Sequence, residues 1–475
     1  MRSCYIPRRA LRSFIIIPLC FFTYSILDYM PEDVLKQVSF LLCWCGIIQI
    51  VCHIYTWKKL TRGWFSVQTI FLIFCFLFNY GQCFLWAFGI HSPIEIGASL
   101  LYYKFEVTPL ILCKSQLITL AVLYSLHVGM MLVYRKKIRY GLNGIKKGVE
   151  ERSVQTIGCK LLFCVVAPVS FYCSIKNLII ARTAGYAAIY YGDAAYSTNT
   201  ILVLISMMFF ASIMGILIFC PRGSKMKKIA IAAFIISSLI QFASGDRGFV
   251  YQICILLFWY MQKEKICMPK TKLIFWLIIG YVGVGLLSSV TKIRGSQITV
   301  SALIASMISA ENLPISSALL EMGASMSPLV ALVAYGSNPY PYGNTFIFSI
   351  PGMITENLIT MLGIPYESLA NWFSADFLGL NSGAAFSIVA EIYMNFGMYV
   401  GLIFAVILGA ILGKLFRIDY STPTREFFSV STVAALISIA RNTFQTGMKT
   451  LFWGVMVYYI LMYAINSIAG RKKSF

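Results

Sequence analysis

Residues 199–220 read NTILVLISMMFFASIMGILIFC, a run without a charged side chain. About 20 predominantly apolar residues are enough for a helix to cross the hydrocarbon core of a bilayer. About twelve runs of this kind follow one another along the chain, which predicts as many transmembrane helices. We therefore expect an all-α, polytopic integral membrane protein that forms a single transmembrane domain over residues 1–475.

The composition agrees with a membrane protein and excludes a soluble domain. Hydrophobic residues make up 59% of the chain and charged residues only 12%, with a mean hydropathy of +0.77. A soluble domain carries about 25% charged residues. The predicted spans are 13–29, 34–56, 64–90, 108–134, 158–180, 199–220, 228–245, 247–262, 272–290, 383–413, 426–444 and 449–469.

The loops between these runs alternate in charge. One set, which starts with the N-terminus, holds most of the 39 lysines and arginines, and the other set is nearly bare of them. Cytoplasmic loops carry this positive excess, so both termini are predicted to be cytoplasmic. The formal net charge of +21 therefore orients the chain and contacts anionic lipid headgroups. The basic runs 135–137 and 471–473 are short and lie at helix ends, which gives no case for a nucleic-acid partner.

Cysteine and histidine usage argues against a metal centre. Most of the 14 cysteines lie inside apolar runs, where cysteine behaves as a small hydrophobe. No pair has the C-x-x-C spacing of a zinc site, and the chain contains three histidines. We expect neither a metal nor a cofactor.

Three arginines lie at the bare, outer ends of the predicted helices: Arg247, Arg294 and Arg441. A cation at a membrane edge is costly to keep there and usually has a negatively charged partner. The planar guanidinium suits phosphate. The pattern therefore points to a lipid-linked phosphate or pyrophosphate on the outer face. The alternatives are an ion pair of Arg247 with Asp246, a solvated loop charge for Arg294, and a structural acid as the partner of Arg441.

One connection, residues 291–382, is far longer than the others and is predicted to be extracytoplasmic. It contains aromatic residues, prolines and apolar runs at helical spacing, which predicts ordered amphipathic helices on the outer surface. Tyr342 and its aromatic neighbours would suit a cleft that stacks sugar rings. The alternative is an interfacial aromatic belt.

Glu391 lies among apolar residues at the start of a predicted helix, and an intramembrane carboxylate is a functional candidate by default. Withdrawn from water, it is a candidate general base. The alternative is a salt bridge to an arginine on another helix. Asp376 and Glu356 are alternative bases, and Asp246 is expected to orient Arg247. The same helix carries small residues every fourth position, including Gly409 and Gly413, which predicts close helix packing.

Three stretches resemble the O-antigen polymerases of the Wzy type, the oligosaccharide repeat-unit polymerases. They are Ser244-Gly-Asp-Arg-Gly-Phe249, Tyr340-Pro-Tyr-Gly-Asn344 and Gly383-Ala-Ala-Phe-Ser-Ile-Val-Ala-Glu-Ile-Tyr-Met-Asn-Phe-Gly397. The large late outer loop between helices nine and ten resembles that family too and implies a GT-C-like architecture.

The resemblance implies polymerisation of oligosaccharide units carried on undecaprenyl pyrophosphate, at the periplasmic face of the bacterial inner membrane. For that reaction we expect Arg247, Arg294 and Glu391 to be catalytic, and Arg441, Asp246, Tyr342 and Asp376 to bind substrate. A chain-length regulator protein is an expected partner. An O-antigen ligase and a flippase for lipid-linked oligosaccharides are alternatives, although transporters are usually built from two related halves, and no internal repeat is visible here.

Overall fold

The computed structural model is helical throughout the residues that it describes. No β-strand occurs among them. The described residues are 15–61, 63–93, 95–98, 105–134, 144–184, 186–189, 199–244, 246, 248–264, 314–336, 344–361, 363–364, 368–379 and 386–471.

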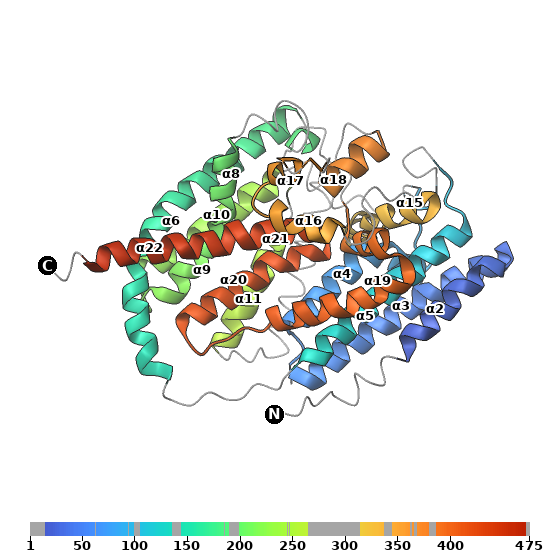
Figure 1. Ribbon diagram of the computed structural model, residues 1–475, viewed down its shortest axis with the longest axis horizontal. Coiled ribbons are helices and arrows are strands. Elements are labelled where there is room, and N and C mark those ends of the chain that lie inside the picture. The colour runs from blue at the N-terminus through green and yellow to red at the C-terminus, as the bar shows by residue number, and fades with distance from the viewer. Residues whose placement is uncertain are drawn as a thin grey trace.

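The helices form two groups that lie beside each other (Figure 1). The first group contains α2 (Ile16–Ile26), α3 (Glu32–Thr61), α4 (Val67–Trp86), α5 (Pro109–Val133) and α19 (Ile388–Leu415). The second contains α6 (Gly144–Thr183), α8 (Thr200–Met207), α9 (Phe209–Phe219), α10 (Lys225–Ser244), α11 (Phe249–Lys263), α20 (Pro423–Leu436), α21 (Phe444–Leu451) and α22 (Tyr458–Arg471). A 3₁₀ turn, η5 (Ile437–Ala440), ends α20, and a π-helical segment, η6 (Phe452–Val457), joins α21 to α22.

The predicted spans have helices at their positions, apart from 272–290, which lies outside the described residues. Within the described part of the chain, nine helices are long and apolar enough to cross a membrane. The predicted number of twelve is not reached there: α2, α11 and α20 are shorter than a full crossing, and the predicted span 272–290 lies outside the described residues. The nine include residues 316–335, which were not predicted to cross. The multi-pass helical class is confirmed.

Basic side chains mark one end of the helices. Lys58 and Lys59 lie in the last turn of α3, Lys263 in the last turn of α11 and Lys414 in the last turn of α19, while α10 begins at Lys225. We call this the basic end. The opposite end, where α4 ends and α5 and α19 begin, is called the far end. The α10–α11 turn and the N-terminus of α21 also lie at the far end, because these helices alternate in direction.

The backbones of α5 and α19 approach closely through glycines. A Cβ on Gly409 would lie 2.3 Å from the Leu126 carbonyl oxygen, and one on Gly129 would lie 2.0 Å from the Val406 carbonyl oxygen. Gly413 packs against the Met130 backbone in the same way. The predicted packing role of the small residues is confirmed at Gly409 and Gly413. Such contacts are the usual means of association for helices in lipid.

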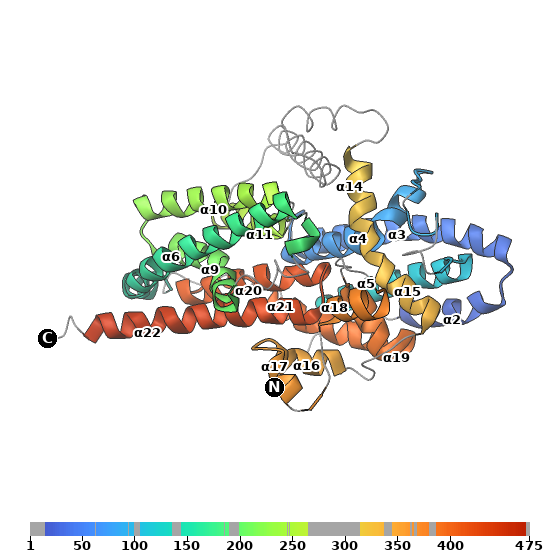
Figure 2. The ribbon, with the colours of Figure 1, turned by 90° about the horizontal axis from the view of Figure 1, so that it is seen from above.

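The predicted outer loop contains an apolar segment formed by α14 (Pro314–Gly323), η3 (Ala324–Met326) and α15 (Ser327–Tyr335). Residues 316–335 are long and apolar enough to cross a membrane, yet α14 runs across α4 and α5 (Figure 2). The Gln82 amide donates to the Leu320 carbonyl at 2.8 Å, and Tyr335 packs edge-on against Phe105 with ring centroids 4.9 Å apart. Since both partners belong to the far end, the segment lies over that end. It differs from the expected surface helix because much of it is buried.

Gly409→Ala should destabilise the protein by about 1–3 kcal/mol, because the added methyl group meets backbone rather than a movable side chain. Gly401→Ala is the matched control on the same helix, where the new Cβ would lie 3.3 Å from the Ile392 side chain. Thermal unfolding in detergent measures the difference. Equal midpoints for the two variants would contradict the close packing.

Candidate active site at the far end

Arg441 lies between the two helix groups, in the break between η5 and α21. Its guanidinium is half-buried and stands 5.4 Å from the centroid of the Phe78 ring on α4. No carboxylate of the described residues forms an ion pair with it. The sequence places Arg441 late in a helix, whereas the structure ends that α-helix at Leu436 and leaves Arg441 in the connection. A half-buried cation without an ion pair is a candidate anion site.

Two buried polar side chains border Arg441. Tyr251, on α11, packs against Phe78 with ring centroids 6.0 Å apart, and it lies within electrostatic reach of Arg441. Asn79, on α4, donates from Nδ2 to the Ala440 carbonyl oxygen at 3.1 Å. The Tyr251 hydroxyl and Asn79 Oδ1 have no hydrogen-bond partner among the described residues. We call Phe78, Asn79, Tyr251 and Arg441 the arginine cluster.

Asp246 lies in the turn from α10 to α11 and is close enough to act electrostatically on Tyr251. Its amide donates to the Gln241 carbonyl, and its Oδ1 accepts the Gly248 amide at 2.8 Å. This carboxylate therefore closes the turn as an Asx motif. Arg247, which it was expected to orient, lies outside the described residues, as do Arg294 and Tyr342.

Glu391 is completely buried in the first turn of α19, and its two oxygens accept separate hydrogen bonds. The Thr345 hydroxyl donates to Oε1 at 2.9 Å, and the Phe444 amide donates to Oε2 at 2.8 Å. Thr345 belongs to α16 (Asn344–Gly352), and Phe444 is the first residue of α21, where free amides favour an anion. The carboxylate thus ties three helices together. No described arginine pairs with it, unlike in the expected salt bridge.

Asn395, one turn further along α19, extends this network. Its Nδ2 donates to the Thr345 hydroxyl oxygen at 2.8 Å and to the Glu391 carbonyl at 2.7 Å. Two residues later the helix breaks at Gly397, which has φ 63° and ψ −163°. That conformation is open essentially to glycine alone. The break separates the polar first turns of α19 from the part that packs on α5.

The remaining acids are arranged differently. Glu356, which precedes α17 (Asn357–Met361), accepts a hydrogen bond from Gln445 on α21 at 3.2 Å. Asp376 is exposed on a π-helical segment, η4 (Trp372–Phe377), and no hydrogen bond or ion pair joins it to another described residue. The structure therefore places Asp246 and Arg441 each within electrostatic range of Tyr251, and Glu391 in a separate network beside α21.

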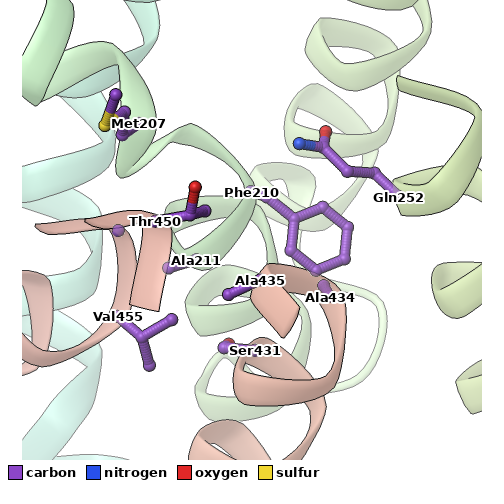
Figure 3. A pocket seen from close by; sticks show the side chains of 10 residues that line it. Met207, Phe210, Ala211, Gln252, Ser431, Ala434, Ala435, Thr450 and Val455 are labelled. Carbon is purple, nitrogen blue, oxygen red and sulfur yellow. The ribbon is translucent and has the colours of Figure 1, made fainter. Parts of the chain in front are cut away.

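A small cavity lies among α8, α9, α11, α20, α21 and η6, and no residue of the arginine cluster lines it (Figure 3). Its volume is about 30 Å³, which is room for one or two water molecules and far less than a sugar requires. Gln252, Ser431 and Thr450 supply its polar groups, and the buried Ser431 hydroxyl has no partner among the described residues. This cavity is a hydration site and not a substrate cleft.

Comparison with known protein families decides the identity. The model of the family described as O-antigen polysaccharide polymerase Wzy matches residues 10–473, nearly the whole chain. The chain belongs to the O-antigen polysaccharide polymerase Wzy family. The resemblance noted from the sequence is thereby confirmed. No match is found among curated proteins or among solved structures.

For this Wzy-family chain, the sequence motifs account for part of the arrangement. The stretch that ends in Asn395 and Gly397 builds the Glu391 network and the break after it. Phe78, Asn79 and Tyr251 were not predicted, because each looks like an ordinary core residue of an apolar helix. The only sequence signal at Asn79 was an amide inside an apolar run, and at Tyr251 it was a position close to the Asp246 turn.

Glu391→Gln should lower the free energy of unfolding by about 1.5–3 kcal/mol, because an amide presents one acceptor oxygen where two donors point. Asp376→Asn, an exposed carboxylate, is the control and should leave stability unchanged. Thermal unfolding of both purified variants measures the effect. A Glu391→Gln protein of wild-type stability that makes no polymer would instead favour the role of a general base.

Proposed function

We propose that the protein polymerises oligosaccharide repeat units carried on undecaprenyl pyrophosphate, at the periplasmic face of the bacterial inner membrane. The match to the Wzy family over residues 10–473 carries the proposal, because that family acts on lipid-linked repeat units. The separation of charge along the helices supports it, since a basic end on the cytoplasmic side puts the arginine cluster on the outer side. Both termini are then cytoplasmic.

The proposed reaction is a glycosyl transfer. A hydroxyl oxygen of the acceptor unit forms a bond to the anomeric carbon of the donor chain. The bond from that carbon to the diphosphate oxygen breaks, and its electron pair leaves with the lipid diphosphate. The hydroxyl proton passes to a carboxylate or to the departing diphosphate. Positive charge placed at the leaving group lowers the barrier because negative charge develops there.

Arg441 is the described residue best placed to bind the diphosphate. Its guanidinium has no ion pair among the described residues, and its fork matches phosphate oxygens. Asp246 holds the turn that carries Arg247, which we propose as a second ligand of the diphosphate. Arg294 remains proposed as a third ligand, and Tyr342 as a contact to the sugar.

Glu391 remains a proposed functional residue, but its contacts favour positioning over proton transfer. Each of its oxygens already accepts a hydrogen bond from a group of the protein, and the side chain is completely buried, so these contacts serve to hold α16 and α21 on α19. By fixing the start of α21, it also fixes the connection that contains Arg441. Asp376 is exposed and unpaired among the described residues, and it is our proposed proton acceptor.

Other functions are less well supported. A ligase would share the lipid diphosphate leaving group but transfer finished chains to a lipid acceptor, and a flippase would move units without chemistry. The family match favours polymerase over both. A chain-length regulator protein is proposed as a partner.

Deleting the gene in its native host should remove long glycan chains while leaving the core that carries one repeat unit. A polymerase acts only after the first unit is available, so single units are still transferred. The surface glycan ladder on a gel shows this directly. Loss of every repeat unit, including the single one, would point to a ligase or a flippase.

Arg441→Ala and Arg247→Ala should each abolish long chains while leaving membrane insertion and abundance intact, because each removes charge from the leaving group. A loss of about 10²-fold or more in rate is expected for such a group. Arg425→Ala, at the basic end near Asp419, is the control and should retain the ladder. Normal long chains from Arg441→Ala would remove that residue from the diphosphate site.

A further inference from the structure

The arginine cluster contains two polar atoms for which the described residues provide no partner. The Tyr251 side chain is 5% exposed and that of Asn79 1% exposed, and both the tyrosine hydroxyl and Asn79 Oδ1 lack a hydrogen bond there. Leaving such a group buried and unpaired costs about 1–3 kcal/mol. Orphaned atoms in native proteins therefore call for an explanation such as a bound water or ligand.

The Asn79 amide is fixed in one orientation. Its Nδ2 donates to two carbonyl oxygens, that of Cys75 at 2.9 Å and that of Ala440 at 3.1 Å. Rotating the amide by half a turn would face its oxygen with two acceptors, so the observed assignment is the one that the network requires. The unpaired atom is consequently an acceptor, and its missing partner must be a donor.

The Tyr251 hydroxyl is also held in place. The ring packs edge-on against Phe74, with centroids 4.8 Å apart, and against Phe78 at 6.0 Å. These contacts fix the position of the ring and hence of the phenolic oxygen. The phenolic O–H, which no described residue engages, can donate one hydrogen bond to a bound group.

A donor and an acceptor beside a cation fit a hydroxyl group that is attached close to a phosphate. A sugar hydroxyl accepts one hydrogen bond and donates another, so it satisfies both a phenol and an amide oxygen. Arg441 adds the charge for a phosphate. We propose that Tyr251 and Asn79 form a hydroxyl-binding subsite next to Arg441 that recognises the sugar attached to the diphosphate. The inference rests on the proposed function and adds a determinant of substrate specificity to it.

Such a subsite would discriminate strongly between substrates. A site whose polar groups are buried rejects analogues that lack the matching hydroxyl, because the protein groups are then left unpaired. Arg441 by itself would bind any phosphate. The neighbouring pair would select which glycosyl diphosphate is accepted as a substrate.

Tyr251→Phe tests the subsite, because it removes one oxygen and keeps the ring. Purified protein in nanodiscs is supplied with lipid-linked repeat units, and kcat/KM is measured. A loss of about 3- to 10-fold is expected for one neutral hydrogen bond. Tyr458→Phe is the control, since Tyr458 is also buried and its hydroxyl lies beside the Cys159 thiol instead of the arginine cluster.

Two further measurements separate the subsite from the phosphate site. Inorganic pyrophosphate, titrated calorimetrically into each protein in nanodiscs, should bind Tyr251→Phe as tightly as the wild type and should bind Arg441→Ala far more weakly. A series of repeat units is prepared in which each lacks a different hydroxyl. One of these analogues should have a low kcat/KM with the wild type, and its kcat/KM should not fall further when Tyr251→Phe replaces the wild type. This non-additivity marks a direct contact.

The outcomes are distinct. If kcat/KM falls no further in Tyr251→Phe than in Tyr458→Phe, the unpaired atoms bind only water and the proposed subsite is wrong. The proposed polymerase function is not affected by that result. If the wild type itself joins no units in nanodiscs, the proposed function fails. Equal effects of every deoxygenated unit in wild type and Tyr251→Phe would likewise overturn the subsite.

Discussion

Inside a bilayer no water is available to hydrogen-bond the chain, and this constraint governs the whole structure. It requires the backbone to be helical, and it requires every interior polar group to find its partner within the protein. Glu391 meets the requirement in full, with a donor for each oxygen. Arg441, Tyr251 and Asn79 do not meet it among the described residues. The contrast separates a group that holds the framework from groups that we propose to contact the substrate.

The two networks are joined through α21. Its first amide is held by Glu391, and the connection just before it carries Arg441. The α16 helix reaches the same helix end through Thr345, so Arg441, the proposed ligand of the diphosphate, is placed by segments from three parts of the chain. This arrangement explains how a residue in an irregular connection is held in position, although no ion pair joins it to the described residues.

The helices were predictable because their cause is local. A run such as 199–220 has one stable state in lipid, and the structure has helices there. The close approach of α5 and α19 was half predictable: the glycines of α19 are visible in the sequence, but Gly129 as their counterpart is not. The course of α14 and α15 across the far end was not predictable, because length and apolar character alone also describe a crossing helix.

The site was predictable only where residue type is unusual for its surroundings. Arg441 and Glu391 stand out because charge in an apolar run needs a reason. The partners of Glu391 could not be predicted, because neither a threonine hydroxyl nor a backbone amide is distinctive in a sequence. Tyr251 and Asn79 became candidates only when their unpaired atoms were seen in three dimensions.

The hydrogen bond from Phe444 to Glu391 also bears on how the protein is made. During synthesis the start of α19 is made before α21. The Glu391 carboxylate therefore leaves water before the Phe444 amide, its later hydrogen-bond donor, has been synthesised. Asn466, near the end of α22, is a second example. Its Oδ1 accepts a hydrogen bond from the Gly158 amide of α6, a helix that is synthesised much earlier. A chain that stops before α21 therefore leaves the Glu391 carboxylate without one of its two donors. Only when α21 and α22 have both been made are the contacts of Glu391 and Asn466 complete.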